Sequence, residues 1–119
     1  MLRVYQCEKC NKTIIAKEEI KAEGWVELVA CSTDAAQEKH VPVVTKKCKT
    51  VKVDVGSVAH PMTEEHLIEW VALETEQGYQ VKYLAAGVAP VCAFTLSDGD
   101  KAVAVYAYCN LHGLWSASV

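Results

Sequence analysis

Short segments in which apolar and polar residues alternate recur through most of the chain. In TVKVDVG, residues 50–56, the valines 51, 53 and 55 share one face of an extended chain and the charged residues between them share the other. An apolar residue at every second position is typical of a half-buried β-strand. Further segments of this kind cover residues 41–46, 66–76, 79–85, 90–96 and 101–109, and a last one surrounds Trp115. The pattern therefore predicts about seven strands.

Turn-forming residues separate these segments, notably at 77–78, 87–90 and 97–100. Short strands divided by turns about every 8–12 residues are typical of a β-sandwich. We therefore predict an all-β protein in which residues 36–119 form an immunoglobulin-like β-sandwich of about seven strands. An eight-stranded barrel is the alternative that the strand count also allows.

The first 35 residues differ in kind from the rest. The sequence CEKC at 7–10 is followed by a stretch rich in lysine and glutamate, and only GWVELVAC at 24–31 has the pattern of a strand. Such a segment is too short to bury a core of its own. We expect residues 1–35 to be a short appendage that a metal or the main domain must order.

Composition limits the class of protein further. The chain has 119 residues, of which 51% are hydrophobic and 23% charged, so it is expected to fold. Its net charge of −3 argues against a nucleic-acid surface. The sequence contains no apolar run of membrane-spanning length and no signal-peptide pattern, so we predict a cytoplasmic protein without membrane contact. Six cysteines in a reducing compartment indicate metal ligands or buried thiols before disulfides.

All four histidines lie where a loop or a strand end is expected. His60 and His66 stand six residues apart in HPMTEEH, so only a loop can bring them together. His112 follows Cys109 by three residues in CNLHG, whose asparagine and glycine favour a tight turn. His40 precedes the segment at 41–46. These four imidazoles and one thiolate are the predicted ligands of a metal ion.

The number of donors indicates which metal. Structural zinc is satisfied by four ligands, whereas four nitrogens and a sulfur suit a five-coordinate iron that cycles between Fe2+ and Fe3+ and keeps a sixth position open. A blue-copper electron carrier, which needs two imidazoles, one thiolate and a weak axial group, is the main alternative. A structural zinc or partner-binding module, which should have no open coordination position, is the third possibility. The visible spectrum of the oxidised protein distinguishes the three.

Three stretches carry a resemblance to a known family. They are EKHVPVV at 38–44, HPMTEEHLIEW at 60–70 and YCNLHGLW at 108–115. Together, and in this order, they resemble the signature motifs of the superoxide reductase family, the iron domain of desulfoferrodoxin and neelaredoxin, over about residues 34–115. The resemblance implies an immunoglobulin-like sandwich with an axial thiolate from Cys109 and four equatorial imidazoles, from His40, His60, His66 and His112.

The resemblance also implies an activity, the one-electron reduction of superoxide to hydrogen peroxide. It implies that Glu38 occupies the sixth position in the oxidised enzyme and that Lys39 lies near the open face, where it attracts the anion and organises water for a proton. A rubredoxin-like protein is the implied electron donor. A dimer or tetramer is expected by analogy with the family.

The N-terminal segment departs from the family pattern. Desulfoferrodoxins hold a second iron there with a CxxC pair and an adjacent pair of cysteines. This chain keeps Cys7 and Cys10, but near the second pair it has only Cys31, between alanine and serine. These three thiols are candidate ligands of a second iron or zinc. Three thiols do not make a tetrathiolate centre, although Cys48 could supply the fourth ligand. We therefore favour the interpretation that the segment is a degenerate remnant of the family's second iron site. Cys92 is expected to be a buried thiol.

Overall fold

The computed structural model describes residues 2–119, which form three antiparallel sheets and one helical turn. The strands are β1 Arg3–Cys7, β2 Thr13–Ala16, β3 Trp25–Glu27, β4 Pro42–Lys47, β5 Thr50–Val55, β6 Ile68–Thr75, β7 Gly78–Tyr83, β8 Val91–Thr95, β9 Ala102–Cys109 and β10 Gly113–Ser118. The helix α1 covers Gln37–His40. Within residues 2–119 there is therefore no helix long and apolar enough to cross a membrane.

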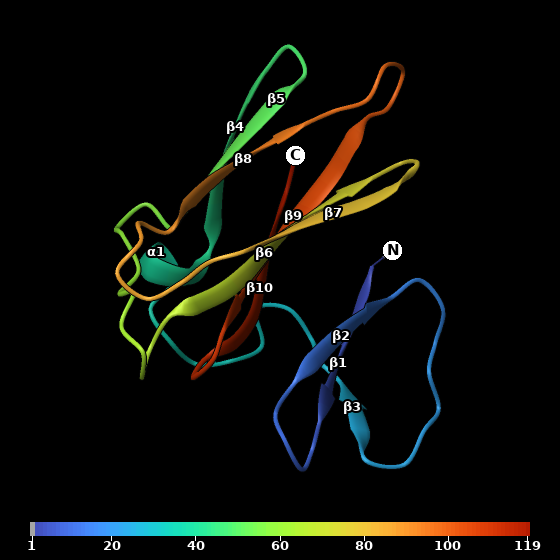
Figure 1. Cartoon of the computed structure of the whole chain (residues 1–119), viewed down its shortest axis with the longest axis vertical. Helices are drawn as coiled ribbons and strands as arrows, with labels where there is room; N and C mark the ends of the chain where they lie inside the picture. Colours follow the sequence, from blue (N-terminus) through green and yellow to red (C-terminus); the bar gives the residue numbers. More distant parts are fainter. Residues whose placement is uncertain (1) are drawn as a thin grey trace.

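Two of the sheets pack face to face and form a sandwich (Figure 1). One has the strand order β10-β9-β6-β7 and the other β4-β5-β8. Alternate residues of β5 fill the space between them, together with fully buried side chains such as Leu73, Phe94 and Val105. The seven strands within residues 42–118 confirm the predicted β-sandwich, and their separation into two sheets excludes the barrel.

The central strands β6 and β9 are buried on both faces, which explains their nearly continuous apolar sequences. In β9, Val105, Ala107 and Cys109 face the interior of the sandwich. The intervening Tyr106 and Tyr108 face the opposite way. A register irregularity between Ile68 and Trp70 interrupts the pairing of β6 with β9, as a β-bulge does.

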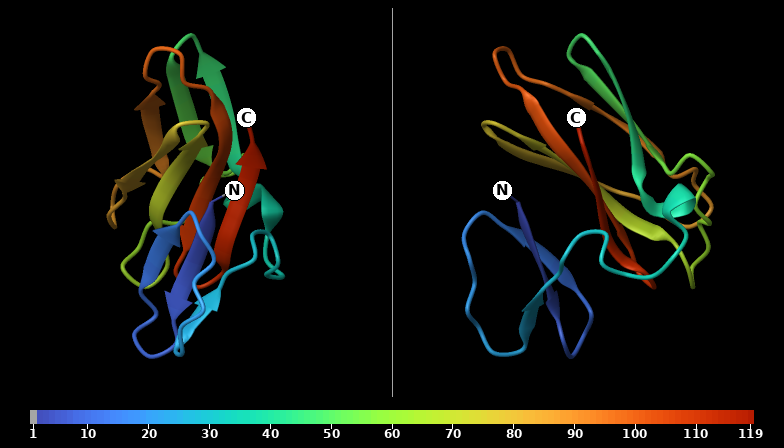
Figure 2. Two further views of the ribbon diagram at one scale, coloured as in Figure 1. Left: turned by 90° about the vertical axis from the view of Figure 1, so that its right-hand side faces the viewer. Right: turned by 180° about the vertical axis from the view of Figure 1, so that it is seen from behind.

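The N-terminal sheet, with the order β2-β1-β3, covers this second face of the four-stranded sheet (Figure 2). Val4 belongs to the same buried cluster as Trp70 and Tyr108. Trp70 Nε1 also donates a hydrogen bond to Thr13 Oγ1 at 2.9 Å. Sequence patterns predicted one strand here and missed β1 and β2. The division of the chain at residue 35 stays a prediction, because the two parts share this buried cluster.

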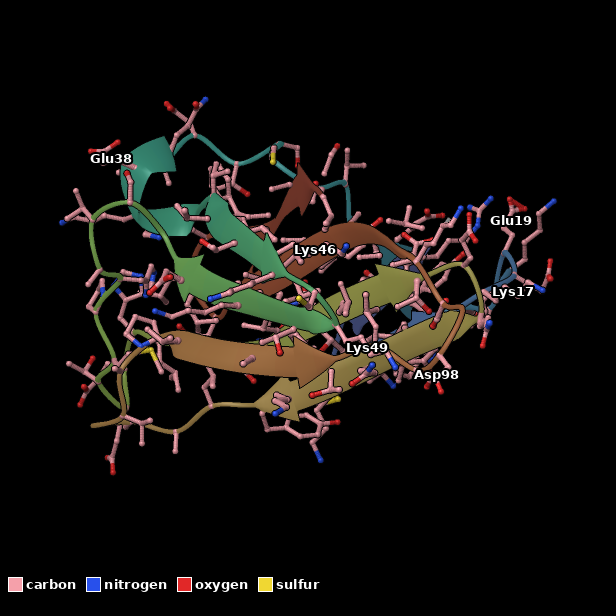
Figure 3. All side chains as sticks on the ribbon, turned by 90° about the horizontal axis from the view of Figure 1, so that it is seen from above. Lys17, Glu19, Glu38, Lys46, Lys49 and Asp98 are labelled. Atoms are coloured by element: carbon pink, nitrogen blue, oxygen red, sulfur yellow. The ribbon has the colours of Figure 1, made fainter. Side chains whose placement is uncertain are left out.

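The predicted metal ligands gather at one end of the sandwich. Helix α1, the β5–β6 loop and the β9–β10 turn meet there, whereas the β4–β5 and β8–β9 turns lie at the other end. Figure 3 shows Glu38 on α1, well separated from Lys49 and Asp98, which form an ion pair between the two distant turns. The sandwich thus supports three loops that converge on one place.

Candidate metal centre

Each predicted ligand lies either at the end of a regular element or in a loop between two strands. His40 is the last residue of α1, and Cys109 is the last residue of β9. His60 and His66 lie in the β5–β6 loop, and His112 lies in the turn before β10. Strand pairing fixes the ends of these loops, so the side chains have little freedom to separate. The structure brings together all five residues that the sequence indicated.

The four imidazole rings stand at the corners of a square. Along its edges the ring centroids are 4.7 Å apart for His40 and His60, 4.6 Å for His60 and His66, 5.0 Å for His66 and His112, and 4.9 Å for His112 and His40. The centroids of His40 and His66 are 6.4 Å apart, as expected for a diagonal. Neighbouring rings are nearly perpendicular, with interplanar angles of 75–89°. Such an arrangement directs four nitrogens at one central point.

Hydrogen bonds determine which nitrogens face the centre. His40 Nδ1 donates to the carbonyl oxygen of Ala36 at 2.7 Å, and His60 Nδ1 donates to that of Pro61 at 2.6 Å. Because a carbonyl only accepts, both rings carry their proton on Nδ1 and present a lone pair at Nε2. These two Nε2 atoms are only 3.2 Å apart. Among the buried side-chain nitrogens and oxygens of residues 2–119, His66 Nε2 is the one that has no hydrogen-bond partner.

Lone pairs in this arrangement fit a cation. His40 Nε2 is 3.1 Å from His112 Nδ1 and 3.2 Å from His60 Nε2. A square with such edges has its centre about 2.2 Å from each corner, close to the metal–imidazole distance of about 2.0–2.1 Å. A metal ion there would convert the repulsion between lone pairs into coordination. The residues present therefore fit the group that the sequence predicted.

Cys109 supplies a fifth donor away from the plane of the rings. Its side chain is fully buried, and Sγ is 3.4 Å from His60 Nε2 and 3.9 Å from His112 Nδ1. Because these nitrogens belong to opposite corners of the square, the sulfur lies near the axis of the square. The ligand atoms of His40, His66, Cys109 and His112 all lie within 4.8 Å of one another.

Burial sets the protonation of these donors. It lowers the pKa of His60 to about 4, with further lowering from the neighbouring histidines, and it also lowers the pKa values of His40 and His66. These rings are therefore neutral at neutral pH, which is the form that binds metals. Burial raises the pKa of the Cys109 thiol. Its thiolate form consequently depends on a nearby cation.

Three residues outside the predicted set hold these ligands in place. Trp115 stacks on His40 with centroids 4.9 Å apart, and its Nε1 donates to the carbonyl oxygen of His112 at 3.0 Å. Asn110 accepts a hydrogen bond from the backbone of the β5–β6 loop and donates one back to it. Gly56 packs against the backbone of α1 so closely that no side chain fits. The motif YCNLHGLW contained the signal for the first two, but no pattern marked the glycine.

Glu38 and Lys39 are exposed side chains on α1, directly before His40. They do not belong to the group of converging donors found within residues 2–119. After the effects of burial and of the other histidines, the charge of Lys39 contributes to the lowered pKa of His66. It contributes to the lowered pKa of His40 as well, so its charge acts on two opposite corners of the square.

The structure does not bring the three N-terminal cysteines together. Cys7 pairs with Trp25 at one end of the N-terminal sheet. Cys31 lies beside β10 instead, where its N–H donates to the carbonyl oxygen of Leu114 at 2.8 Å. Cys48 is exposed in the β4–β5 turn, and Cys92 is half-buried in β8, where burial raises its pKa to about 11. Within residues 2–119 the histidine and cysteine site is the one group arranged as metal ligands.

A β-sandwich with a partly buried square of imidazoles and an axial thiol defines a class of metalloprotein with one His4Cys centre. Residues 32–118 match the family model described as desulfoferrodoxin. The chain belongs to this family. It is 41% identical over 126 residues to a desulfoferrodoxin of Syntrophotalea carbinolica, an alignment that covers 98% of this chain and 95% of the relative.

Solved structures agree with this assignment. The superoxide reductase of Treponema pallidum superposes with a TM-score of 0.82 at 41% identity, covering 88% of this chain and 93% of that one. The superoxide reductase of Giardia intestinalis, described as a 1Fe-SOR, gives a TM-score of 0.60 at 33% identity and covers 69% and 97% of the two chains.

Proposed function

We propose that this protein is a superoxide reductase, which converts superoxide, one electron and two protons into hydrogen peroxide. The square of four imidazoles with the Cys109 sulfur on its axis is the observation that carries the proposal. Family membership supports the same activity. The ligands would be His40, His60, His66, His112 and Cys109, and they would hold a mononuclear iron.

The donor set favours iron over the alternatives. A blue-copper site uses two imidazoles and a weak axial group, which would leave two corners of the square without a role. A structural zinc needs four ligands and no open position. When bound, iron supplies the one-electron chemistry by cycling between its ferrous and ferric states. The buried thiolate would provide a strong electron donor on one side of the imidazole square, and the substrate would approach from the opposite side.

The exposed pair on α1 would act on the substrate side. Lys39 places a positive charge close to the square, where it would attract an anion and hold a water that supplies a proton. Glu38 follows as the candidate sixth ligand in the oxidised state. Both roles are supported by their position directly before His40, whose ring is a corner of the square.

Family resemblance supports three further assignments. We infer a rubredoxin-like electron donor, because the electron consumed in each turnover must be replaced from outside. A homo-oligomer and a cytoplasmic location are proposed on the same basis. The positions of Cys7, Cys10 and Cys31 give no support to a second iron or zinc in the N-terminal sheet.

Metal analysis with a visible spectrum of the oxidised protein tests the proposal. Iron with a thiolate-to-iron charge-transfer band supports it. Intense blue copper absorption or a colourless zinc protein would each overturn it. Consumption of superoxide, followed after rapid mixing, then tests the activity directly.

Lys39→Ala tests the role of the lysine in capture. We expect the bimolecular rate with superoxide to fall by a few-fold to about tenfold and its salt dependence to weaken, because one steering charge is lost. Lys46→Ala is the matched control, since it removes an equal charge from an exposed lysine on β4, away from Glu38 (Figure 3). Equal rates for the two variants would reject the steering role.

A further inference from the structure

The β1–β2 turn carries two cysteines that the metal centre does not use. Cys7 ends β1, and Cys10 follows three residues later in the turn that leads to β2. Backbone hydrogen bonds close the turn, from Cys7 N to the Lys12 oxygen at 2.8 Å and from Asn11 N to the Cys7 oxygen at 2.9 Å. Asn11 has a φ of 61°, a conformation that asparagine tolerates. The two thiols are thus fixed in one short loop.

A metal does not fit this pair as the chain stands. A tetrathiolate centre needs four sulfurs, and the third cysteine of the segment is directed elsewhere. Leu28 N donates to the Val4 oxygen, so the chain after β3 runs along β1 away from Cys7. It then reaches β10, where Cys31 Sγ lies 3.7 Å from the Ser116 oxygen. Cys7 and Cys10 remain as two thiols without further ligands from the described chain.

Their spacing suits a bond between the two sulfurs. Residues three apart in a turn have Cα atoms within about 7 Å, and disulfides join Cα atoms about 4.4–6.8 Å apart. Both thiols are free, Cys10 is exposed and Cys7 is partly exposed. Hydrogen bonds from the backbone of Cys10, from the Cys10 thiol and from the backbone of Lys9 lower the pKa of Cys7. A lowered pKa favours the thiolate of Cys7, which is the nucleophilic form of the side chain.

We propose that Cys7 and Cys10 form a redox-active pair that hydrogen peroxide oxidises to an intramolecular disulfide. The Cys7 thiolate attacks one peroxide oxygen, the O–O bond breaks, and the leaving hydroxide takes a proton to give water and a sulfenic acid on Cys7. The Cys10 sulfur then attacks the Cys7 sulfur, the S–O bond breaks, and a second water leaves. Two thiols and one peroxide become one disulfide and two waters. Exchange with an external dithiol restores the pair.

The source of the oxidant rests on the proposed function, since hydrogen peroxide is the product of superoxide reduction. The thiol chemistry does not depend on it. Adding hydrogen peroxide directly to the whole protein therefore separates the two ideas, because a protein inactive towards superoxide could still form the disulfide. A protein active towards superoxide could equally leave both thiols reduced.

Thiol mapping of the intact, iron-loaded protein provides the test. The reduced protein is treated with a small excess of hydrogen peroxide, alkylated under denaturing conditions, and digested for mass spectrometry. We expect the loss of two alkylatable thiols and a cross-linked peptide that contains Cys7 and Cys10. The exposed thiols of Cys31 and Cys48 should still react with the alkylating reagent. Treatment with a reducing dithiol should restore alkylation of Cys7 and Cys10.

Two variants make the result specific. In Cys10→Ser the sulfenic acid cannot resolve, so a dione reagent should label Cys7. Cys31→Ser is the matched control and should form the disulfide as the unchanged protein does. Alkylation of Cys7 and Cys10 to the same extent as Cys48, a disulfide through Cys31, or a metal that protects both thiols without a sulfur–sulfur bond would each overturn the proposal.

Discussion

Replacing Gly56 with alanine should disturb the metal centre without touching any ligand. A Cβ at this position would lie 2.6 Å from the Glu38 oxygen and 3.0 Å from both the Lys39 carbonyl carbon and the Val41 oxygen. All three neighbours are backbone atoms of α1 and of the residue after it, so no flexible side chain can move aside. The Glu38 oxygen is also fixed by a hydrogen bond from Val58 N at 2.8 Å. The added methyl must therefore displace α1 itself, and with it His40.

The size of the effect follows from the overlap. The contact has to lengthen from 2.6 Å to at least 3.0 Å, below which real Cβ contacts essentially do not occur. Inserting a methyl into such a packed place costs about 1–3 kcal/mol. For a chain of this size, that lowers the midpoint of thermal unfolding by roughly 4–15 °C. Because α1 carries a corner of the imidazole square, the charge-transfer band of the oxidised iron protein should also shift.

Thermal unfolding and the visible spectrum of Gly56→Ala should be measured beside two controls. Ser57→Ala lies in the same turn and removes only a 3.3 Å hydrogen bond to the Glu38 oxygen. Gly99→Ala strains a residue with a φ of 79° in the distant β8–β9 turn, so it should lower stability and leave the spectrum unchanged. If Gly56→Ala kept both the unfolding midpoint and the spectrum of the unchanged protein, the inference that this contact positions His40 would be wrong.

Two further substitutions test other parts of the structure. Asn110→Ala should lower the free energy of unfolding by about 1–2 kcal/mol, because the Leu67 N–H and the Glu65 oxygen lose their partners at 3.0 and 2.9 Å. Asn110→Asp should keep the hydrogen bond from Leu67 N–H and therefore lose less. If denaturant titrations gave equal losses for the two variants, this interpretation would be wrong. Burial and Glu74 raise the pKa of Tyr106 to about 12, so the folded protein favours the neutral hydroxyl. The stability that this neutral form contributes should be complete below pH 10, the ordinary pKa of tyrosine, and should be lost as the pH rises towards 12. Tyr106→Phe should flatten this alkaline decline in denaturant titrations, whereas a change of the exposed Tyr79 to phenylalanine should not.

The strands of the sandwich were predictable because each leaves a visible signal in the sequence, either alternation or clear turn residues at its ends. The valines of β5 alternate with charged residues, so a period of two is visible in the sequence. β6 and β9 lack this alternation, but turn residues bound them clearly. The strands β1 and β2 were missed because both are short and border a cysteine-rich turn, and their stability comes from packing on Trp70 and Tyr108. That contact joins residues distant in the sequence, so no local pattern reports it.

The ligands of the candidate centre were also predictable, because histidine is rare in this chain and all four occur in loop motifs. The residues that position them were not. Gly56 acts through a contact with α1, about 17 residues earlier, and its sequence context resembles an ordinary turn. The one-turn helix itself was expected to be a loop leading into a strand. Such supports depend on how two loops meet, which only the fold determines.

The hydrogen bonds of the histidines orient them as metal ligands. Backbone carbonyls accept the Nδ1 protons of His40 and His60, so their Nε2 lone pairs face each other at 3.2 Å. Facing lone pairs repel, and contacts such as the stacking of Trp115 on His40 hold the rings in this orientation. A cation removes the repulsion, whereas protons on two adjacent rings would replace it with repulsion between charges. The rigid fold should therefore favour metal over protons, in agreement with the lowered pKa values of His40 and His60.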